Sequence, residues 1–287
     1  MKQKKGYMIV NSFFLSLSAV MFYKIFMTDT DSSGEGVLLR VACMILLTSA
    51  TVHGLKAFRL YVALYGKGVS FGSHMKQYSK TAIVSMILPV KSGDLFRAYC
   101  YGNLVKSWYS GIVLAVLDRF MDTLALVTMM FLMQAAGIAQ AIPLLYVLLA
   151  ALAGILVCYL ICPQICRYWK RYFLILDASV RRNQVLRSLC YLEHAYGEVA
   201  AVVKGRGVIL YVLSLLAWIV ETGGLAILSR MLSDRGTGQA VSAYLLAALA
   251  GTESAYLKQF VAVSVALMGA LYLLIGMADM IRKGGIH

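Results

Sequence analysis

Residues 207–230 read GVILYVLSLLAWIVETGGLAILSR, an apolar run with a single carboxylate near its middle. A helix needs about 20 mainly apolar residues to cross the hydrocarbon core of a bilayer, so this run predicts a membrane span. Glu221 is an ionisable group where charge is expensive, and Gly223 and Gly224 after it permit a kink or a close neighbouring helix. The run therefore predicts a membrane helix that carries a polar group into the protein interior.

Other stretches of the chain share this apolar character. The composition is 61% hydrophobic and 14% charged, whereas soluble domains contain about 45–50% apolar and about 25% charged residues. We expect one all-α transmembrane domain over residues 1–287, a polytopic helical bundle of about six full spans. The six expected spans are residues 7–27, 37–58, 118–137, 143–162, 207–230 and 257–280. We expect the first span to be retained rather than cleaved as a signal peptide.

The charges of the loops predict the orientation of the spans. The loop 28–36 is acidic and lacks basic residues, whereas the loop 163–206 holds eight basic and three acidic residues. Because basic loops mark the cytoplasmic side, we expect 163–206 to be a cytoplasmic loop, with an amphipathic surface helix at 185–203. Both chain termini are expected in the cytoplasm.

This orientation requires two segments that do not cross the membrane. Residues 68–117 carry several charges, and the apolar piece within 240–256 is too short to cross alone. We expect both to be re-entrant, although a pair of crossings within 68–117 would give the same ends. Non-helical backbone at membrane depth needs protein or a wet cavity around it, so the two segments predict an internal cavity.

The sequence LPVKSGDLFR at residues 88–97 predicts a helix break followed by a new helix. Its proline ends the incoming helix, and Gly93 permits a tight backbone turn. Asp94 and Arg97 stand at i,i+3 spacing and can pair locally. The break also leaves backbone N–H groups free beside Lys91 and Arg97, which suits a phosphate or a lipid headgroup. A capped helix start with a local ion pair is the structural alternative.

The sequence LDRFMD at residues 117–122 puts Asp118 and Asp122 on one helix face, with Arg119 turned about 100° away from Asp118. Two carboxylates on one face suit an acid/base pair or a metal site, but neither a histidine nor a third ligand accompanies them. Pairing with the basic residues of 80–97 would neutralise both sets in a low dielectric. A buried ion-pair network that only fixes the fold is the alternative.

Other ionisable residues in apolar sequence extend this set. Glu221 suits a proton carrier or a counter-charge for Arg59 or Lys80, and a protonated carboxyl with one interhelical hydrogen bond is the alternative. Glu253 stands where the second short segment would turn. Arg59 belongs to a basic strip on the second span that also includes His53 and Lys56. The long side chains of Lys56 and Arg59 can instead extend to the inner membrane surface.

The net charge of +14 arises from 27 basic and 13 acidic residues. Basic residues beside apolar spans attract anionic lipid headgroups, so we expect the membrane and an anionic lipid as partners, and no nucleic acid. The six cysteines form neither a CxxC pair nor a Cys/His cluster, so we expect no metal and no cofactor. No G-x-x-x-x-G-K-[ST] loop occurs, so transport would depend on a gradient or mass action.

The two charged motifs together, Leu-Pro-x-Lys-x-Gly-Asp-x-x-Arg and Val-Leu-Asp-Arg-x-x-Asp, lie between Leu88 and Leu126. They resemble the Pro-x-x-x-Gly-Glu-x-x-Arg and Glu-Arg-x-x-Asp elements of the lysylphosphatidylglycerol synthase transmembrane family, with Asp for both leading Glu residues. A third element of that family, a Pro-Gly-Gly-x-Gly-x-x-Glu turn, is represented only by Gly251 and Glu253. The residues that fill the first two elements are Pro89, Gly93, Asp94, Arg97, Asp118, Arg119 and Asp122.

The resemblance implies re-entrant helices, a bacterial cytoplasmic membrane and a proposed role as a lipid flippase. Members of the family belong to aminoacylated phospholipid, hopanoid or polyprenyl-linked sugar pathways. We expect the chain to lack the aminoacyl-transferase domain of the full synthases.

We therefore expect a flippase-like transporter rather than an enzyme, which moves an anionic phospholipid or a polyprenyl-phosphate-linked sugar. Lys91, Arg97 and Arg119 would hold the phosphate, while the acidic residues Asp118, Asp122 and Glu221 would balance charge or exchange protons. One alternative is a membrane glycosyltransferase or lipid-modifying enzyme with Asp94 or Asp118 as base. Another is a non-catalytic scaffold of a glycan-assembly complex. The sequence leaves open the lipid, the direction of movement and a homodimeric assembly.

Overall fold

The computed structural model describes residues 2–26, 35–88, 92–137, 143–175, 180–232, 237–250 and 255–284. In this part of the chain all regular structure is helical, which confirms the predicted all-α polytopic bundle. The helices are α1 (Lys2–Phe26), α2 (Glu35–Leu64), α3 (Phe71–Ile87), α4 (Ser92–Val105), α5 (Trp108–Ala135), α6 (Pro143–Ile175), α7 (Val180–Leu232), α8 (Thr237–Ala250) and α9 (Ala255–Gly284).

Within the described residues, four helices are long and apolar enough to cross a membrane. They contain the stretches Arg40–Leu64 of α2, Leu145–Ile175 of α6, Val180–Arg230 of α7 and Lys258–Ala278 of α9. The 28 residues of α5 are also long enough, but three charged residues interrupt their apolar sequence. The expected number of six full spans stays a prediction.

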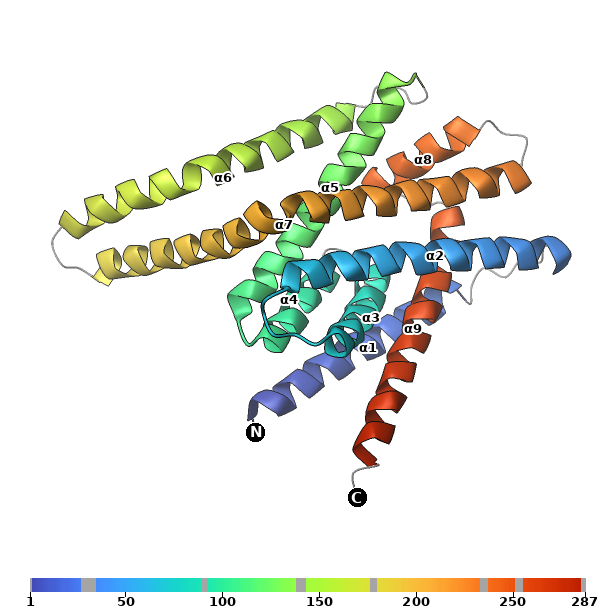
Figure 1. Ribbon diagram of the computed structural model, residues 1–287, viewed down its shortest axis with the longest axis horizontal. Coiled ribbons are helices and arrows are strands. Elements are labelled where there is room, and N and C mark those ends of the chain that lie inside the picture. Colours follow the sequence, from blue (N-terminus) through green and yellow to red (C-terminus); the bar gives the residue numbers. More distant parts are fainter. Residues whose placement is uncertain are drawn as a thin grey trace.

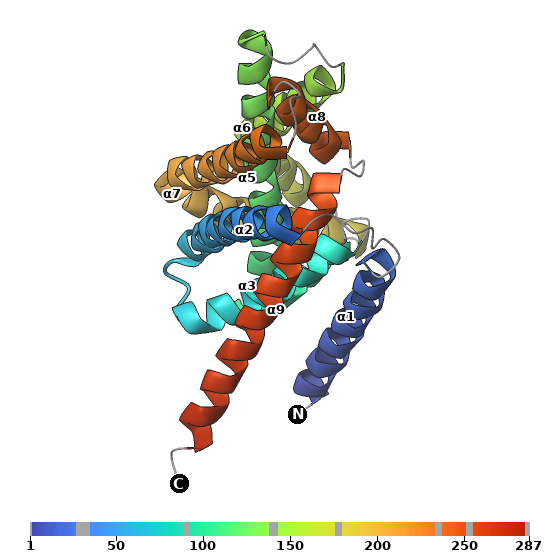
Figure 2. The same ribbon diagram turned by 90° about the vertical axis from the view of Figure 1, so that its right-hand side faces the viewer.

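The long helices α2 and α7 lie side by side and define the long axis of the molecule (Figure 1). α5 crosses them, and the short helices α3 and α4 pack together against α5 and α9. α1 contacts the bundle through α3 and α4, and Figure 2 shows it on the side of α3 away from α7. One apolar cluster joins most of these helices, with Leu60, Tyr101 and Leu210 almost fully buried.

The segment 68–117 contains two short helices and the beginning of α5. α3 has 17 residues and α4 has 14, fewer than the about 20 that a crossing needs. The re-entrant interpretation of this segment stays a prediction. α5 begins at Trp108, earlier than the start expected at residue 118, because the Ser107 side chain caps it by accepting a hydrogen bond from the Ser110 N–H.

The segment expected as a cytoplasmic loop, 163–206, is instead helical in its described part. α6 continues to Ile175 and α7 begins at Val180, so residues 185–203 belong to α7 and are not a separate surface helix. These sequences are rich in good helix formers, and no proline follows Pro163. The two helices form a hairpin that extends past the other helices (Figure 1), and Lys170 pairs with Glu193 across it.

The length of α7 has a consequence for its place in the membrane. Its 53 residues extend over about 80 Å at about 1.5 Å per residue. A bilayer with its headgroups is about 40–45 Å thick. Part of α7 must therefore extend out of the membrane, and its polar first half is the part suited to water.

Candidate functional site

α3 and α4 approach each other closely where Gly93 faces Ser85. A Cβ atom added to Gly93 would lie 2.3 Å from Ser85 Cα, so only glycine permits this approach. Ser85 Oγ then accepts a hydrogen bond of 3.0 Å from Arg97 Nη2. The glycine of the LPVKSGDLFR motif thus lets α3 hold the arginine one turn further along α4. Residues 89–91 of this motif, Lys91 among them, lie outside the described residues.

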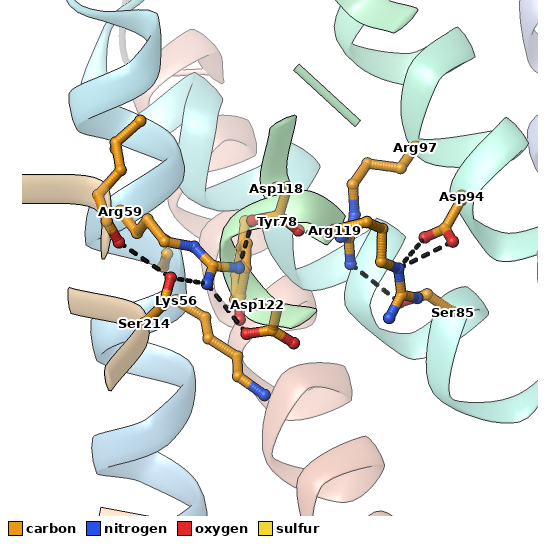
Figure 3. A network of polar contacts seen from close by, with 12 residues as sticks. Lys56, Arg59, Tyr78, Ser85, Asp94, Arg97, Asp118, Arg119, Asp122 and Ser214 are labelled. Carbon is orange, nitrogen blue, oxygen red and sulfur yellow. Dashed lines mark hydrogen bonds and ion pairs between the residues drawn. The ribbon is translucent and has the colours of Figure 1, made fainter. Parts of the chain in front are cut away.

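Asp118 on α5 lies between two guanidinium groups (Figure 3). Its Oδ1 accepts a hydrogen bond from Arg59 of α2, and its Oδ2 accepts one of 2.5 Å from Arg97 of α4. The side chains of Asp118, Arg59 and Arg97 are 6%, 4% and 9% exposed. We call these three residues the buried triad. Because an isolated charge is very costly in such surroundings, the triad holds α2, α4 and α5 together.

Asp122, one turn after Asp118, connects the triad to α7. Its Oδ1 accepts a hydrogen bond of 3.0 Å from Arg59, which also donates to Ser214 Oγ. Its backbone carbonyl accepts a hydrogen bond of 3.1 Å from the Trp218 indole. Asp118 and Asp122 share one helix face, as expected, and both hold guanidinium groups. The described residues contain no group of three or more His, Cys, Asp or Glu that could hold a metal ion.

Two further ion pairs lie beside the triad and are more exposed. Arg119 Nε donates to both carboxylate oxygens of Asp94 at 2.8 Å, and 49% of the Arg119 side chain is exposed. Lys56 Nζ lies 3.6 Å from Glu221 Oε2, and 24% of the Lys56 side chain is exposed. Glu221 Oε1 also accepts a hydrogen bond from Tyr244 of α8. We call Arg119–Asp94 and Lys56–Glu221 the rim pairs.

A cavity of about 120 Å³, the central cavity, lies among these groups. It has room for about four water molecules at about 30 Å³ each, so a small charged group fits but a whole lipid does not. The rim carboxylates Asp94 and Glu221 are not part of its wall. The charged residues of the wall are four cations and two carboxylates: Lys56, Arg59, Arg97, Arg119, Asp118 and Asp122.

His53 and Tyr78 also form part of the cavity wall. His53 Nδ1 lies 2.9 Å from the Tyr78 hydroxyl, and both residues are buried. His53 Nε2 has no hydrogen-bond partner among the described residues. Because a buried polar atom without a partner is costly, this nitrogen gives the cavity wall an unused hydrogen-bonding position.

The structure brings most of the predicted site residues together from α2, α4, α5 and α7, but it corrects two predicted pairings. Asp94 pairs with Arg119 and not with Arg97, because Arg97 reaches across the helix interface to the more deeply buried Asp118. Glu221 pairs with Lys56, not with Arg59 or Lys80. The predicted residues that converge are Arg59, Asp94, Arg97, Asp118, Arg119, Asp122 and Glu221 (Figure 3 labels all but Glu221).

One other predicted residue, Lys80, does not enter this site. Lys80 is directed to α1, where its ammonium donates to the Tyr7 hydroxyl at 2.8 Å and to Asn11 Oδ1 at 3.0 Å. Glu253, like Lys91, lies outside the described residues.

Several site residues were not predicted from the sequence. Lys56 had a signal, its i,i+3 spacing with Arg59, but that spacing also suits a side chain extending to the membrane surface. No sequence signal marked the hydroxyl groups of Ser85, Ser214 and Tyr244, because serine and tyrosine occur throughout the apolar segments. Their roles depend on which helices pack together.

A bundle of apolar helices of membrane length, with an ion network inside it, defines a multi-pass membrane protein. The model of one protein family, described as the lysylphosphatidylglycerol synthase TM region, matches residues 12–279. The chain therefore belongs to this family, and the match includes both charged motifs. Comparisons with curated proteins and with solved structures gave no match.

Proposed function

We propose that this protein moves a lipid with an anionic headgroup between the leaflets of the membrane, and that the headgroup binds at the rim pairs. The candidate lipids are an anionic phospholipid and a polyprenyl-phosphate-linked sugar. The observation that carries the proposal is the charge of the central cavity, whose wall holds four cations and two carboxylates. A phosphate group is the complement of such a wall.

The rim pairs supply a means of exchange. Arg119 and Lys56 are the more exposed cations, and their carboxylate partners lie outside the cavity wall. A phosphate can replace Asp94 on Arg119, or Glu221 on Lys56, so that each cation keeps an anionic partner throughout. Transport requires binding that is strong enough to capture the ligand and weak enough to release it. Competition with a built-in carboxylate provides such a balance.

The surface around Arg119 also suits a lipid. Leu95, next to Asp94 on α4, is 72% exposed, and Val116, one turn before Arg119 on α5, is 62% exposed. A half-exposed guanidinium beside exposed apolar side chains matches a molecule with an anionic head and apolar tails. A soluble anion would gain nothing from these apolar neighbours.

A leaflet-exchange assay in proteoliposomes tests the proposal. Headgroup-labelled phosphatidylglycerol is placed in both leaflets, and a reductant that does not cross the membrane bleaches the outer label. We expect the wild-type protein to make the inner label accessible, and Arg119→Gln to slow this exchange at least about tenfold, since a charge-assisted hydrogen bond is worth about 1.5–3 kcal/mol. Lys170→Gln, which removes a cation from the α6–α7 hairpin, is the matched control and should leave the rate unchanged.

Two results would contradict the proposal. One is a folded Arg119→Gln, Lys56→Gln double variant that exchanges lipid at the wild-type rate. The network would then have only a structural role. Equal exchange of labelled phosphatidylcholine, which is zwitterionic, would show that the protein does not recognise the anionic headgroup. Labelled polyprenyl phosphate in the same assay distinguishes the two candidate lipids.

A further inference from the structure

A second pocket, which we call the α1 pocket, lies between α1 and the region where α4 meets α5. Its volume is about 840 Å³, within the about 300–1,000 Å³ of typical small-molecule sites. It shares no wall residue with the central cavity. The wall consists of Tyr7, Gln77, Tyr99, Gly102, Asn103, Leu104, Lys106 and Trp108.

The polar residues of the α1 pocket form a connected wall. The Tyr7 hydroxyl and the Gln77 amide hydrogen-bond to each other, with Gln77 Nε2 donating at 2.9 Å. Behind them Lys80, only 4% exposed, donates to the same Tyr7 hydroxyl. Its other acceptor is the neutral amide of Asn11, and its ammonium lies 4.8 Å from the centre of the Tyr7 ring. Among the described residues, Lys80 therefore has neutral partners but no carboxylate.

A buried ammonium without a counter-charge is costly, and hydroxyl, amide and ring contacts compensate it only in part. Lys80 is not part of the wall of the α1 pocket, and the cation in that wall is Lys106, which is exposed. Among the described residues, none of those that line the pocket is acidic. Lys106 has φ of 58°, in the turn where Ser107 N–H bonds the Gly102 carbonyl after α4. The turn fixes the position of Lys106 beside the pocket.

Three aromatic rings give the α1 pocket an amphipathic character. Tyr99 lies 5.8 Å from Tyr7 and 6.3 Å from Trp108, measured between ring centres, and Trp108 is 53% exposed. Tyrosine and tryptophan favour the headgroup level of membranes, where one end of the ring is apolar and the other is wet. The sequence adds Lys2, Lys4 and Lys5 directly before Tyr7, and such basic clusters attract anionic leaflets.

We propose that the α1 pocket is a second lipid site, which binds the phosphate-bearing headgroup of an anionic phospholipid. Lys106 in the pocket wall pairs with the phosphate, while Lys80 adds positive charge from behind Tyr7 and Gln77. The aromatic rings hold the glycerol part. This site is separate from the central cavity, and its occupation does not depend on transport through that cavity.

The fluorescence of Trp108 tests this proposal, since only three tryptophans occur in the chain. The purified full-length protein in neutral detergent is titrated with short-chain phosphatidylglycerol, and the spectrum of Trp108→Phe is subtracted. We expect a saturable change that Lys106→Gln weakens about tenfold, as the loss of a charge-assisted hydrogen bond predicts, and that Lys106→Arg preserves. Lys170→Gln, the control, should titrate like the wild type.

Three outcomes would overturn the α1 pocket as a lipid site. One is a Lys106→Gln titration equal to that of the wild type. Another is an equal response to short-chain phosphatidylcholine. The third is an equal response to glycerol 3-phosphate at the same concentration, which would assign the pocket to a soluble phosphate compound. Arg119→Gln separates this proposal from the transport proposal, because it should impair leaflet exchange and leave the Trp108 titration unchanged.

Discussion

The buried triad and the rim pairs use the same kinds of side chain under different conditions. Arg59, Arg97 and Asp118 are less than 10% exposed, and both carboxylate oxygens of Asp118 are occupied by guanidinium groups. In the rim pairs Arg119 is 49% exposed, and Lys56 lies 3.6 Å from its partner. The first arrangement holds helices together, whereas the second leaves its cations within reach of a ligand.

This difference indicates how one network can combine two roles. Breaking a buried pair leaves an uncompensated charge and costs much stability, whereas an exposed pair contributes little. In the proposed mechanism, exposure and the number of partners therefore separate structural from exchangeable charges. Residue type alone does not, since arginine and aspartate occur in both sets.

The largest effect is expected from removing the carboxylate of the triad. Asp118→Asn would remove the carboxylate that Arg97 pairs with and leave Asp122 as the carboxylate partner of Arg59. We therefore expect a loss of about 3–5 kcal/mol in the free energy of unfolding. Denaturant unfolding in mild detergent measures it. Glu193→Gln, which removes the carboxylate of the exposed α6–α7 hairpin pair, should cost much less stability. Equal losses in both variants would erase the distinction between buried and exposed pairs.

A smaller loss of stability is expected from Gly93→Ala. The added Cβ would meet the α3 backbone at 2.3 Å, so α3 and α4 must separate and the Ser85–Arg97 hydrogen bond is weakened. We expect a cost of about 1–3 kcal/mol, as for overpacked cores. Gly223→Ala is the control, because no atom lies within 4 Å of its added Cβ. If both variants unfold alike, the close helix contact does not position Arg97.

The rim pairs predict opposite effects of two substitutions on lipid affinity. Asp94→Asn frees Arg119 from its competitor, so binding of anionic lipid should become several-fold tighter, while Arg119→Gln should weaken it. We expect Asp94→Asn to change the free energy of binding by on the order of 1 kcal/mol and Arg119→Gln by about 1.5–3 kcal/mol. Native mass spectrometry with phosphatidylglycerol measures both, at matched protein and lipid concentrations. Weaker binding by Asp94→Asn would mean that Asp94 helps to hold the ligand.

Ionic strength should have the smallest effect and should act on the rim alone. The Debye length falls from about 10 Å at 0.1 M to about 3 Å at 1 M salt, which screens exposed charges more than buried ones. We expect leaflet exchange of phosphatidylglycerol to slow a few-fold over this range, and the Arg119→Gln variant to respond less. A wild-type rate independent of salt would place the ligand-binding cations inside the buried network instead.

Much of the fold could be predicted from the sequence, because the length and apolar character of a membrane helix are local properties. The run 207–230 lies within α7, and residues 257–280 within α9. The beginning of α5 was misplaced because residues 68–117 were interpreted as one re-entrant segment, although residues 112–117 (IVLAVL) are apolar. Residues 163–206 belong to α6 and α7 in their described part, because a basic, polar sequence suits a water-exposed helix as well as a loop. Their cytoplasmic location stays a prediction.

Part of the membership of the candidate site could be predicted, and the expected pairing of Asp118 with a basic residue of 80–97 is confirmed by its contact with Arg97. The other pairings could not be predicted. Asp118, Arg119, Asp122 and Glu221 were predicted without any structure, because a charged side chain in apolar sequence is energetically costly and usually has a partner. Which cation meets which carboxylate depends on the crossing of α2, α4 and α5, which no spacing along one helix encodes. Local spacing therefore predicted an Asp94–Arg97 pair, whereas the packed helices give each residue a partner on α5.

The central claim is that an anionic headgroup replaces the carboxylates of the rim pairs. A cryo-electron microscopy structure in nanodiscs of phosphatidylglycerol tests it most directly. The account predicts a phosphate bound to Arg119 or Lys56, with Asp94 or Glu221 moved away and the Arg59–Asp118–Arg97 contacts unchanged. Lipid only on the outer helix surfaces, with both rim pairs closed, would contradict it.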